Sequence, residues 1–316
     1  MPINLGLCCL NTELRKKKIF TSRTVRFATF EKIGFEAVKK LSMENLDDLE
    51  KMLHWNKENG ISVFRMSSEM FPHISNLNIF NIDYDAAMEY YKLEWCKDRL
   101  KQIGDLAKEL DIRLTFHPGQ YNQLGSPKKD VVSKTLVDLE WHCKVLDLME
   151  CDEQSIVVLH GGGMFESKKN TLARIEETYN NLPERIKRRI VLENCEKCYS
   201  VEDLLPLCKK NMIPLVYDTH HYTCYAKLHP NEKQKPMEDL LPEVLMTWSI
   251  RGIKPKFHIS EQGSGRIGHH SDYIEVIPEH LIKLSKSGGE FDLMVEAKMK
   301  EQAIIKLRGI YPDACC

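Results

Sequence analysis

The sequence lacks long hydrophobic runs and an excess of charge of either sign. Its 316 residues contain no stretch of about 20 apolar residues. The N-terminal residues MPINLGLCCLN have neither the basic segment nor the long apolar segment of a signal peptide. We therefore expect no membrane span and no secretory leader. Lys and Arg number 45 against 46 Asp and Glu, so a polyanionic partner would be held by a local basic patch or by bound cations.

Paired cysteines and flexible linkers are also scarce. The eleven cysteines are an odd number scattered along the chain, which favours free thiols in a reducing intracellular compartment, the cytoplasm or a nucleus. Cys195-x-x-Cys198 has no second pair at zinc-ribbon spacing, so no structural zinc is expected. Without a Ser/Gly/Pro-rich linker, residues 1–316 are expected to form one monomeric domain. A short disordered tail, with Cys315 and Cys316, is expected after about residue 309.

Short apolar runs rich in β-forming residues recur along the chain and alternate with amphipathic segments. They are apolar throughout, which is typical of parallel strands covered on both faces. One intervening helix is expected to begin at Ser42 and to stop at Asn59-Gly60. Eight strand-helix units in a chain of this length predict an α/β fold, a single (β/α)8 TIM barrel. The eight runs span residues 3–7, 62–66, 112–116, 155–159, 189–192, 214–217, 256–259 and 291–295.

Six of these strands end in side chains that bind metals. The carboxyl ends of barrel strands carry the active site of this fold, so these side chains are expected to meet at one rim. They are, in chain order, His117, His160, Glu193, Asp218 with His221, His258 and Glu296.

Carboxylates that converge in this way need bound cations. A buried carboxylate is costly unless it is paired or bound to a metal, and Arg65 and Lys256 are too few to neutralise the group. Mixed nitrogen and oxygen ligands suit Zn²⁺ or Mn²⁺, with Mg²⁺ as a further alternative. Two or three such ions held about 4 Å apart suit displacement at phosphorus. A phosphodiester is therefore the expected substrate.

The motifs around these positions resemble those of the UV damage endonucleases, barrel enzymes related in architecture to endonuclease IV. The resemblance runs over roughly residues 3–305. It implies an ATP-independent enzyme that nicks duplex DNA on the 5′ side of ultraviolet photoproducts. The motifs are LGLCCLN (5–11), SRTVR (22–26), FRMSSEMFP (64–72), LTFHPGQY (114–121), VLHGGG (158–163), LENC (192–195), VYDTHHY (216–222), KFHIS (256–260), HHSDY (269–273) and VEAKMKEQA (295–303).

The resemblance implies the same metal ligands and adds His270. Glu193 would bridge two ions, and Glu296 would close the ring beside it. Lys256 lies two residues before His258, on the same face of a strand. With Glu193 and Glu296 it is expected to be a catalytic residue beside the cluster. Its side chain would be neutral, modified or in contact with phosphate.

Two ligand positions stay open. His269 is an alternative to His270, its neighbour in the sequence. Asn76 stands where the family often carries a further metal-binding histidine. The sequence therefore leaves two ions or three.

The resemblance also implies contacts with damaged DNA. A photoproduct reaches a barrel rim only when it leaves the base stack, and another group must fill the gap. Gln120 and Tyr121, after the corner Pro118-Gly119, offer an amide and an aromatic face for this purpose. Asn11 would contact the flipped nucleotides. The expected phosphate contacts are Arg23, Arg26, Lys168, Lys169 and Arg266.

Three other functions share part of this pattern. A metal-dependent sugar isomerase would use the barrel and the cluster, but the Gln120-Tyr121 loop would then lack a purpose. An abasic-site endonuclease would differ only in the lesion that it flips. A non-catalytic lesion-binding protein would not need the carboxylates Glu193, Asp218 and Glu296, which are all present.

Overall fold

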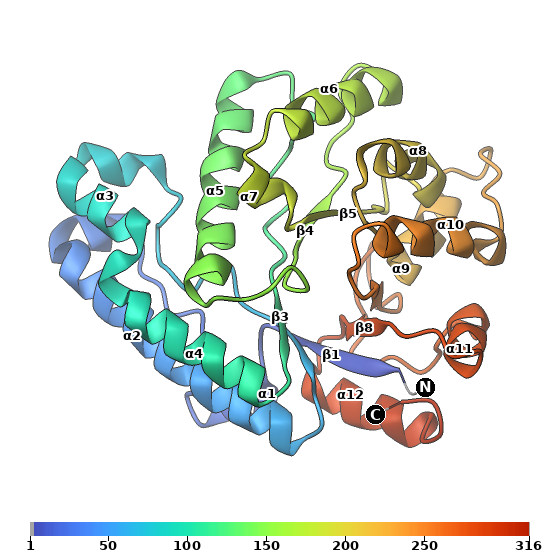
Figure 1. Cartoon of the computed structure of the whole chain (residues 1–316), viewed down its shortest axis with the longest axis horizontal. Helices are drawn as coiled ribbons and strands as arrows, with labels where there is room; N and C mark the ends of the chain where they lie inside the picture. The colour runs from blue at the N-terminus through green and yellow to red at the C-terminus, as the bar shows by residue number, and fades with distance from the viewer. Residues whose placement is uncertain (1–2, 316) are drawn as a thin grey trace.

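The computed structural model describes residues 3–315 and shows short strands enclosed by helices (Figure 1). Each predicted β-run contains a strand, and the strands pair in parallel throughout. The strands are β1 (Asn4–Cys8), β2 (Val63–Arg65), β3 (Arg113–Thr115), β4 (Val157–His160), β5 (Ile190–Glu193), β6 (Leu215–Val216), β7 (Lys256–Ile259) and β8 (Asp292–Val295).

The strands close into a barrel. Five of them form a sheet in the order β3-β2-β1-β8-β7, and three form a sheet in the order β4-β5-β6. Parallel bridges between Phe116 and Val157 and between Asp218 and His258 join the two sheets at both edges. The backbone N–H of Phe116 donates to the carbonyl of Ile156, at 2.9 Å. The predicted (β/α)8 barrel is therefore confirmed.

Helices cover the outside of the barrel, and Figure 1 shows α2 and α4 packed along one side of it. The helices are α1 (Thr12–Lys16), α2 (Phe27–Glu58), α3 (Tyr84–Lys92), α4 (Lys97–Glu109), α5 (Lys129–Leu148), α6 (Lys168–Asn180), α7 (Glu184–Lys187), α8 (Val201–Asn211), α9 (Thr219–Leu228), α10 (Met237–Ser249), α11 (Glu279–Lys286) and α12 (Glu301–Ile310), with the 3-10 turns η1 (Leu77–Asn81) and η2 (Glu94–Cys96).

The start predicted for the helix at Ser42 is wrong. Helix α2 begins at Phe27 and is interrupted at Gly34, whose φ of 73° and ψ of −175° are not helical, and Ser42 is buried in the helical part that follows. The Ser42 hydroxyl donates to the carbonyl of Val38 at 2.8 Å, so it is satisfied within the helix rather than at a cap. The predicted stop is confirmed, since Asn59 is the C-cap.

The C-terminal end of the chain also differs from expectation. Residues 311–315 are not a free tail, because Cys315 is buried and pairs with Ile3 beside β1. Figure 1 shows the two termini close together next to α12. Cys316 lies outside the described residues. Nine cysteines of the described chain, from Cys8 to Cys224, are free thiols, in agreement with the sequence.

Over residues 3–315, no helix is both long enough and apolar enough to cross a membrane.

Candidate metal centre and nucleic-acid interface

Strand register brings the predicted ligands together at the carboxyl end of the barrel. His160 and Glu193 are the last residues of β4 and β5 and are direct register partners. Asp218 follows β6 and pairs with His258 in β7. Aligned ends of parallel strands thus hold imidazoles and carboxylates side by side.

Glu193 lies at the centre of this group. Its Oε2 atom is 2.8 Å from Nε2 of His117 and 3.5 Å from Nδ1 of His160. Its Oε1 atom is 2.7 Å from Nδ1 of His258 and 3.8 Å from Nδ1 of His221. Each carboxylate oxygen therefore faces two imidazoles, which is the arrangement needed for a ligand shared between ions.

Glu296 and Lys256 lie beside His258. The Oε1 atom of Glu296 is 3.3 Å from Nδ1 of His258 and accepts a hydrogen bond from Nη1 of Arg65 at 2.5 Å. Lys256 is fully buried, and its Nζ atom is 2.8 Å from Nε2 of His258. The strand spacing predicts this position for Lys256.

Burial and neighbouring charges set the protonation of the cluster. Burial alone would raise the pKa of Glu193, but His258, His160 and His117 lower it well below its usual value. Burial lowers the pKa of His160 to about 4 and also lowers that of His117. At neutral pH the Glu193 carboxylate is thus ionised and these two imidazoles are neutral, as metal ligands must be.

Asp218 and His221 are held in place by Asn194. The backbone N–H of Asp218 donates to Oδ1 of Asn194 at 2.8 Å, and the Nδ1–H of His221 donates to the carbonyl of Asn194 at 2.9 Å. Burial lowers the pKa of His221, but Asp218 and Glu193 raise it to about 9. A metal ion bound to His221 would displace a proton.

Two observations show that the cluster fits divalent ions. The groups His117/His258/Glu296, His117/His160/Glu193 and Glu193/Asp218/His221 each place three ligand atoms within 4.8 Å of one another. Oδ2 of Asp218 is buried and has no hydrogen-bond partner among the described residues. A buried carboxylate oxygen without a partner is costly, and a cation at this position would satisfy it.

The structure does not bring His270 or Asn76 into these groups. The ring of His270 lies 5.8 Å from that of His220, and His269 is exposed. Asn76 caps η1, where its side chain accepts a hydrogen bond from the backbone N–H of Asn78. The role of His270 as a ligand stays a prediction.

Gln120 and Tyr121 project from the rim beside the cluster. Tyr121 is 65% exposed, and both residues line a cavity of about 450 Å³ that reaches His117, His160 and Glu296. A Cβ atom at position 119 would lie 2.6 Å from the Tyr121 ring. The ring can therefore keep this position only with glycine at residue 119. The exposed loop and the buried cluster share one cavity.

Two of the predicted DNA contacts, Asn11 and Arg23, have partners within the fold. Asn11 is 1% exposed, and its Oδ1 accepts a hydrogen bond from the backbone N–H of Leu14 at the start of α1. Arg23 forms a 2.5 Å ion pair with Asp48, which is buried in α2. Both side chains thus make contacts within the fold, and their contacts with DNA stay predictions.

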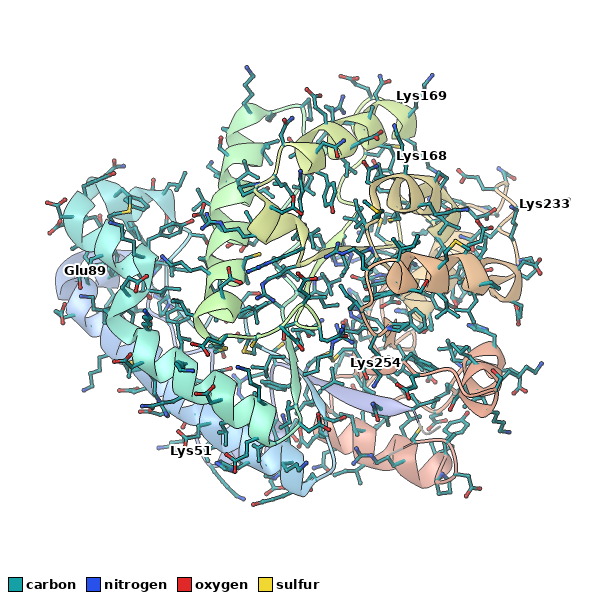
Figure 2. The ribbon with its side chains drawn as sticks, in the orientation of Figure 1. Lys51, Glu89, Lys168, Lys169, Lys233 and Lys254 are labelled. Carbon is teal, nitrogen blue, oxygen red and sulfur yellow. The ribbon has the colours of Figure 1, made fainter. Side chains whose placement is uncertain are left out.

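The two lysines at the start of α6, Lys168 and Lys169, differ in their surroundings. Figure 2 shows Lys168 on the side of α6 nearest α8 and Lys169 on its outer side. Lys168 lies 3.0 Å from Asp203 and 3.1 Å from Glu232, so its charge is neutralised within the fold and it is not a free phosphate ligand. Lys169, Arg26 and Arg266 are exposed, and their contacts with phosphate stay predictions.

Sequence reasoning counted Arg65 among the cations of the cluster but missed Glu196. Arg65 pairs with Glu296 and is the last residue of β2. Glu196 lies 3.9 Å from His221 and follows a strand by three residues, beyond the strand-end pattern. Only the loop conformation returns its carboxylate to the rim.

Fold and site together define a parallel (β/α)8 barrel with a candidate metal centre at the carboxyl ends of its strands. Residues 3–311 match the family model of UV-endonuclease UvdE. The chain belongs to this family, which confirms the resemblance in its motifs.

Similar proteins agree with the family match. The UV-damage endonuclease of Schizosaccharomyces pombe is 39% identical over 96% of the chain, which spans 50% of that protein's length. The putative UV-damage endonuclease of Acanthamoeba polyphaga mimivirus is 37% identical over 98% of the chain and 92% of its own length. The crystal structure of SacUVDE superposes with a TM-score of 0.81 at 28% identity, over 98% of both chains.

Proposed function

We propose that this chain is an endonuclease that hydrolyses a phosphodiester of duplex DNA 5′ to an ultraviolet photoproduct, with two or three bound divalent ions and no nucleotide cofactor. The observation that carries the proposal is Glu193, whose two oxygens each face two imidazoles at the ends of the barrel strands. Family membership supports damaged DNA as the substrate.

Four imidazoles around Glu193 would hold the ions together with that carboxylate. His117 and His160 face one oxygen of Glu193, and His258 and His221 face the other. The mixed donor set favours Mn²⁺ or Zn²⁺ over Mg²⁺. When bound, such ions lower the pKa of a water molecule and neutralise charge that develops on the phosphate.

Lys256 and Arg65 would act by positioning ligands. Burial lowers the pKa of Lys256 to about 8, and Arg65 acts in the same direction. Because Lys256 is fully buried and touches Nε2 of His258, it orients that imidazole so that Nδ1 faces Glu193 and Glu296. Arg65 fixes Glu296 by its hydrogen bond. Lys256 therefore acts through His258 rather than by contact with phosphate.

Gln120 and Tyr121 would recognise the lesion. They line the cavity that leads to His117 and His160, and Tyr121 is largely exposed. A flipped photoproduct leaves unpaired bases behind. An aromatic ring can stack in the gap, and an amide can hydrogen-bond to the base edges.

The test is a nicking assay on end-labelled duplexes that carry one cyclobutane dimer, one abasic site or no lesion. Each duplex is incubated with the protein in Mn²⁺ and, separately, in chelator. We expect a metal-dependent cut immediately 5′ to the dimer, no cut in undamaged DNA and no cut in chelator. The length of the labelled product gives the side of cleavage.

Other outcomes identify the competing functions. Cleavage only at the abasic site would replace the proposal with an activity like that of endonuclease IV. Intact Mn²⁺ binding without cleavage of any duplex would leave a sugar isomerase or a lesion-binding protein. Equal cleavage in chelator would refute the metal mechanism.

A further inference from the structure

The orientation of His221 indicates where its metal-binding nitrogen points. A backbone carbonyl only accepts hydrogen bonds, so the 2.9 Å contact between Nδ1 of His221 and the carbonyl of Asn194 requires the hydrogen on Nδ1. Once a metal ion has displaced the second proton, the lone pair of the neutral imidazole is on Nε2. A hydrogen bond from the other ring nitrogen is the usual way in which a protein fixes a metal-binding histidine.

The carboxylate on the Nε2 side is Glu196. Its Oε2 atom lies 3.9 Å from Nε2 of His221, a separation that one ion can span when each ligand atom is about 2.0–2.2 Å from the metal. The Glu196 side chain is 14% exposed and has one lysine neighbour, Lys197, at 3.5 Å with a 68% exposed side chain. Glu196 therefore presents a mostly buried, weakly paired carboxylate to the free nitrogen of His221.

A cavity beside Glu196 leaves room for a cation on this side of the cluster. Glu196 and His160 line the same cavity of about 170 Å³.

We infer that Glu196 is an additional ligand of the metal cluster and binds, with His221, the ion on the Nε2 side of that imidazole. This inference rests on the proposed metal-dependent function. It assigns a ligand outside the strand-end series, on the side of His221 that bears Nε2, whereas the carboxylates of Glu193 and Asp218 lie beside Nδ1.

The test is a titration of metal-free protein with Mn²⁺, followed by isothermal calorimetry and by electron paramagnetic resonance of free Mn²⁺. Glu196→Gln removes the charge and keeps the size, and Glu196→Asp keeps the charge with a shorter reach. We expect Glu196→Gln to lose about one equivalent of Mn²⁺, or to bind it about 10- to 100-fold more weakly. Glu196→Asp should retain part of that affinity.

The matched control is Glu238→Gln. Glu238 lies 3.8 Å from His280, so it forms a comparable carboxylate–imidazole pair away from the cluster. This variant should bind Mn²⁺ as the unaltered protein does. Circular dichroism melting of every variant separates loss of a ligand from loss of the fold.

The outcomes distinguish the inference from the function on which it rests. If the unaltered protein binds Mn²⁺ and cuts damaged DNA while Glu196→Gln titrates identically, the inference alone is wrong. If the unaltered protein binds no Mn²⁺, both the proposed function and the inference fail. Selective loss of one equivalent in Glu196→Gln supports the ligand.

Discussion

Glu193 joins the ligands of neighbouring strands, because each of its oxygens lies near two imidazoles. In Glu193→Gln, an amide nitrogen replaces one oxygen and cannot bind a cation. We expect nicking of dimer-containing duplex to fall by about 1,000-fold or more, comparable to the loss of a major electrostatic contributor. Single-turnover rates measure the loss, and an unchanged circular dichroism spectrum verifies the fold. A variant that cuts at the original rate would contradict the bridging role.

Tyr121 tests lesion recognition separately from metal binding. Its ring is 65% exposed and belongs to the loop beside the cluster. Tyr121→Ala removes the stacking surface, worth about 1–3 kcal/mol per base, so affinity for dimer-containing DNA should fall roughly tenfold or more while Mn²⁺ content stays the same. The control is Tyr84→Ala, a 61% exposed tyrosine on α3. Unchanged preference for damaged over undamaged DNA in Tyr121→Ala would exclude the probe role.

Single residues show what the sequence can and cannot predict about the site. Ligands at strand ends are predictable because parallel strands bring their ends to one rim, as with His160 and Glu193. The sequence does not show whether a polar side chain binds a ligand or a partner within the fold. Asn11 caps α1 and Lys168 pairs with Asp203 and Glu232, and those partners are remote in sequence or hidden in loop geometry.

Among the elements, α4 and α5 make a contact that depends on one glycine. A Cβ atom at Gly104 in α4 would lie 1.8 Å from the carbonyl oxygen of Met149, which is backbone at the end of α5 and cannot rotate away. Gly104→Ala should therefore destabilise the protein by about 1–3 kcal/mol or more, despite the better helix propensity of alanine. Chemical denaturation monitored by circular dichroism measures this change.

A glycine near the end of α12 is the matched control. A Cβ atom at Gly309 meets open space, so Gly309→Ala should be neutral or stabilise by up to about 1 kcal/mol. Changes of opposite sign in the free energy of unfolding would show that the contact with Met149, and not the replacement of glycine by alanine as such, determines the stability change. Equal effects would contradict the close approach of α4 and α5.

The buried residue His142 of α5 makes the free energy of unfolding depend on pH. It is fully buried, its Nδ1–H donates to the carbonyl of Asp138 at 2.7 Å, and its ring stacks 3.7 Å from that of Trp141. Burial lowers its pKa from 6.5, so the folded protein holds it neutral while the unfolded chain takes up a proton below that pH. The unfolded state then binds more protons, and the free energy of unfolding falls as pH decreases below 6.5.

The variant His142→Phe isolates this effect. Between pH 7.5 and 5.5 in chelator, the unaltered protein should lose up to about 1.4 kcal/mol more stability than the variant. Urea denaturation at both pH values measures the difference. The cluster histidines are the same in both proteins, so their contributions cancel in the comparison. An equal loss in both would mean that His142 stays neutral in the unfolded chain or is protonated in the fold.

The helices and strands were predictable where the spacing of apolar residues determines which of the two forms. The buried face Leu46, Leu49, Met52 and Leu53 of α2 follows helical spacing, and the apolar β-runs all contain strands. Element ends were less predictable, because tertiary packing overrides local signals. Ser42 has the chemistry of a cap but lies inside α2, and Cys315 is ordered only because it packs against Ile3 from the opposite end of the chain.

For the whole molecule, near-neutral charge shapes the expected binding of DNA. With 45 basic and 46 acidic side chains, the chain has no global attraction for a polyanion. Many lysines and arginines are also paired within the fold, as Lys168 and Arg23 are. We therefore expect a small number of phosphate contacts and a shallow dependence of DNA affinity on salt.

The salt dependence can identify which cations reach the phosphates. The logarithm of the association constant falls with the logarithm of salt by about 0.9 per phosphate neutralised. Arg26 is exposed at the start of α2 and makes no capping hydrogen bond from its side chain. Arg26→Ala should reduce the slope for undamaged duplex, measured in Mn²⁺ between about 50 and 200 mM salt, by about one.

Lys168→Ala is the matched comparison, since it also removes one positive charge. Its ammonium group is held between Asp203 and Glu232, so the slope should stay unchanged while stability decreases slightly. A reduced slope in Lys168→Ala with none in Arg26→Ala would mean that DNA breaks the internal ion pairs and that α6, not the start of α2, faces the duplex. The salt slopes of the two variants on undamaged duplex therefore indicate which part of the barrel rim faces the DNA, whatever lesion the protein recognises.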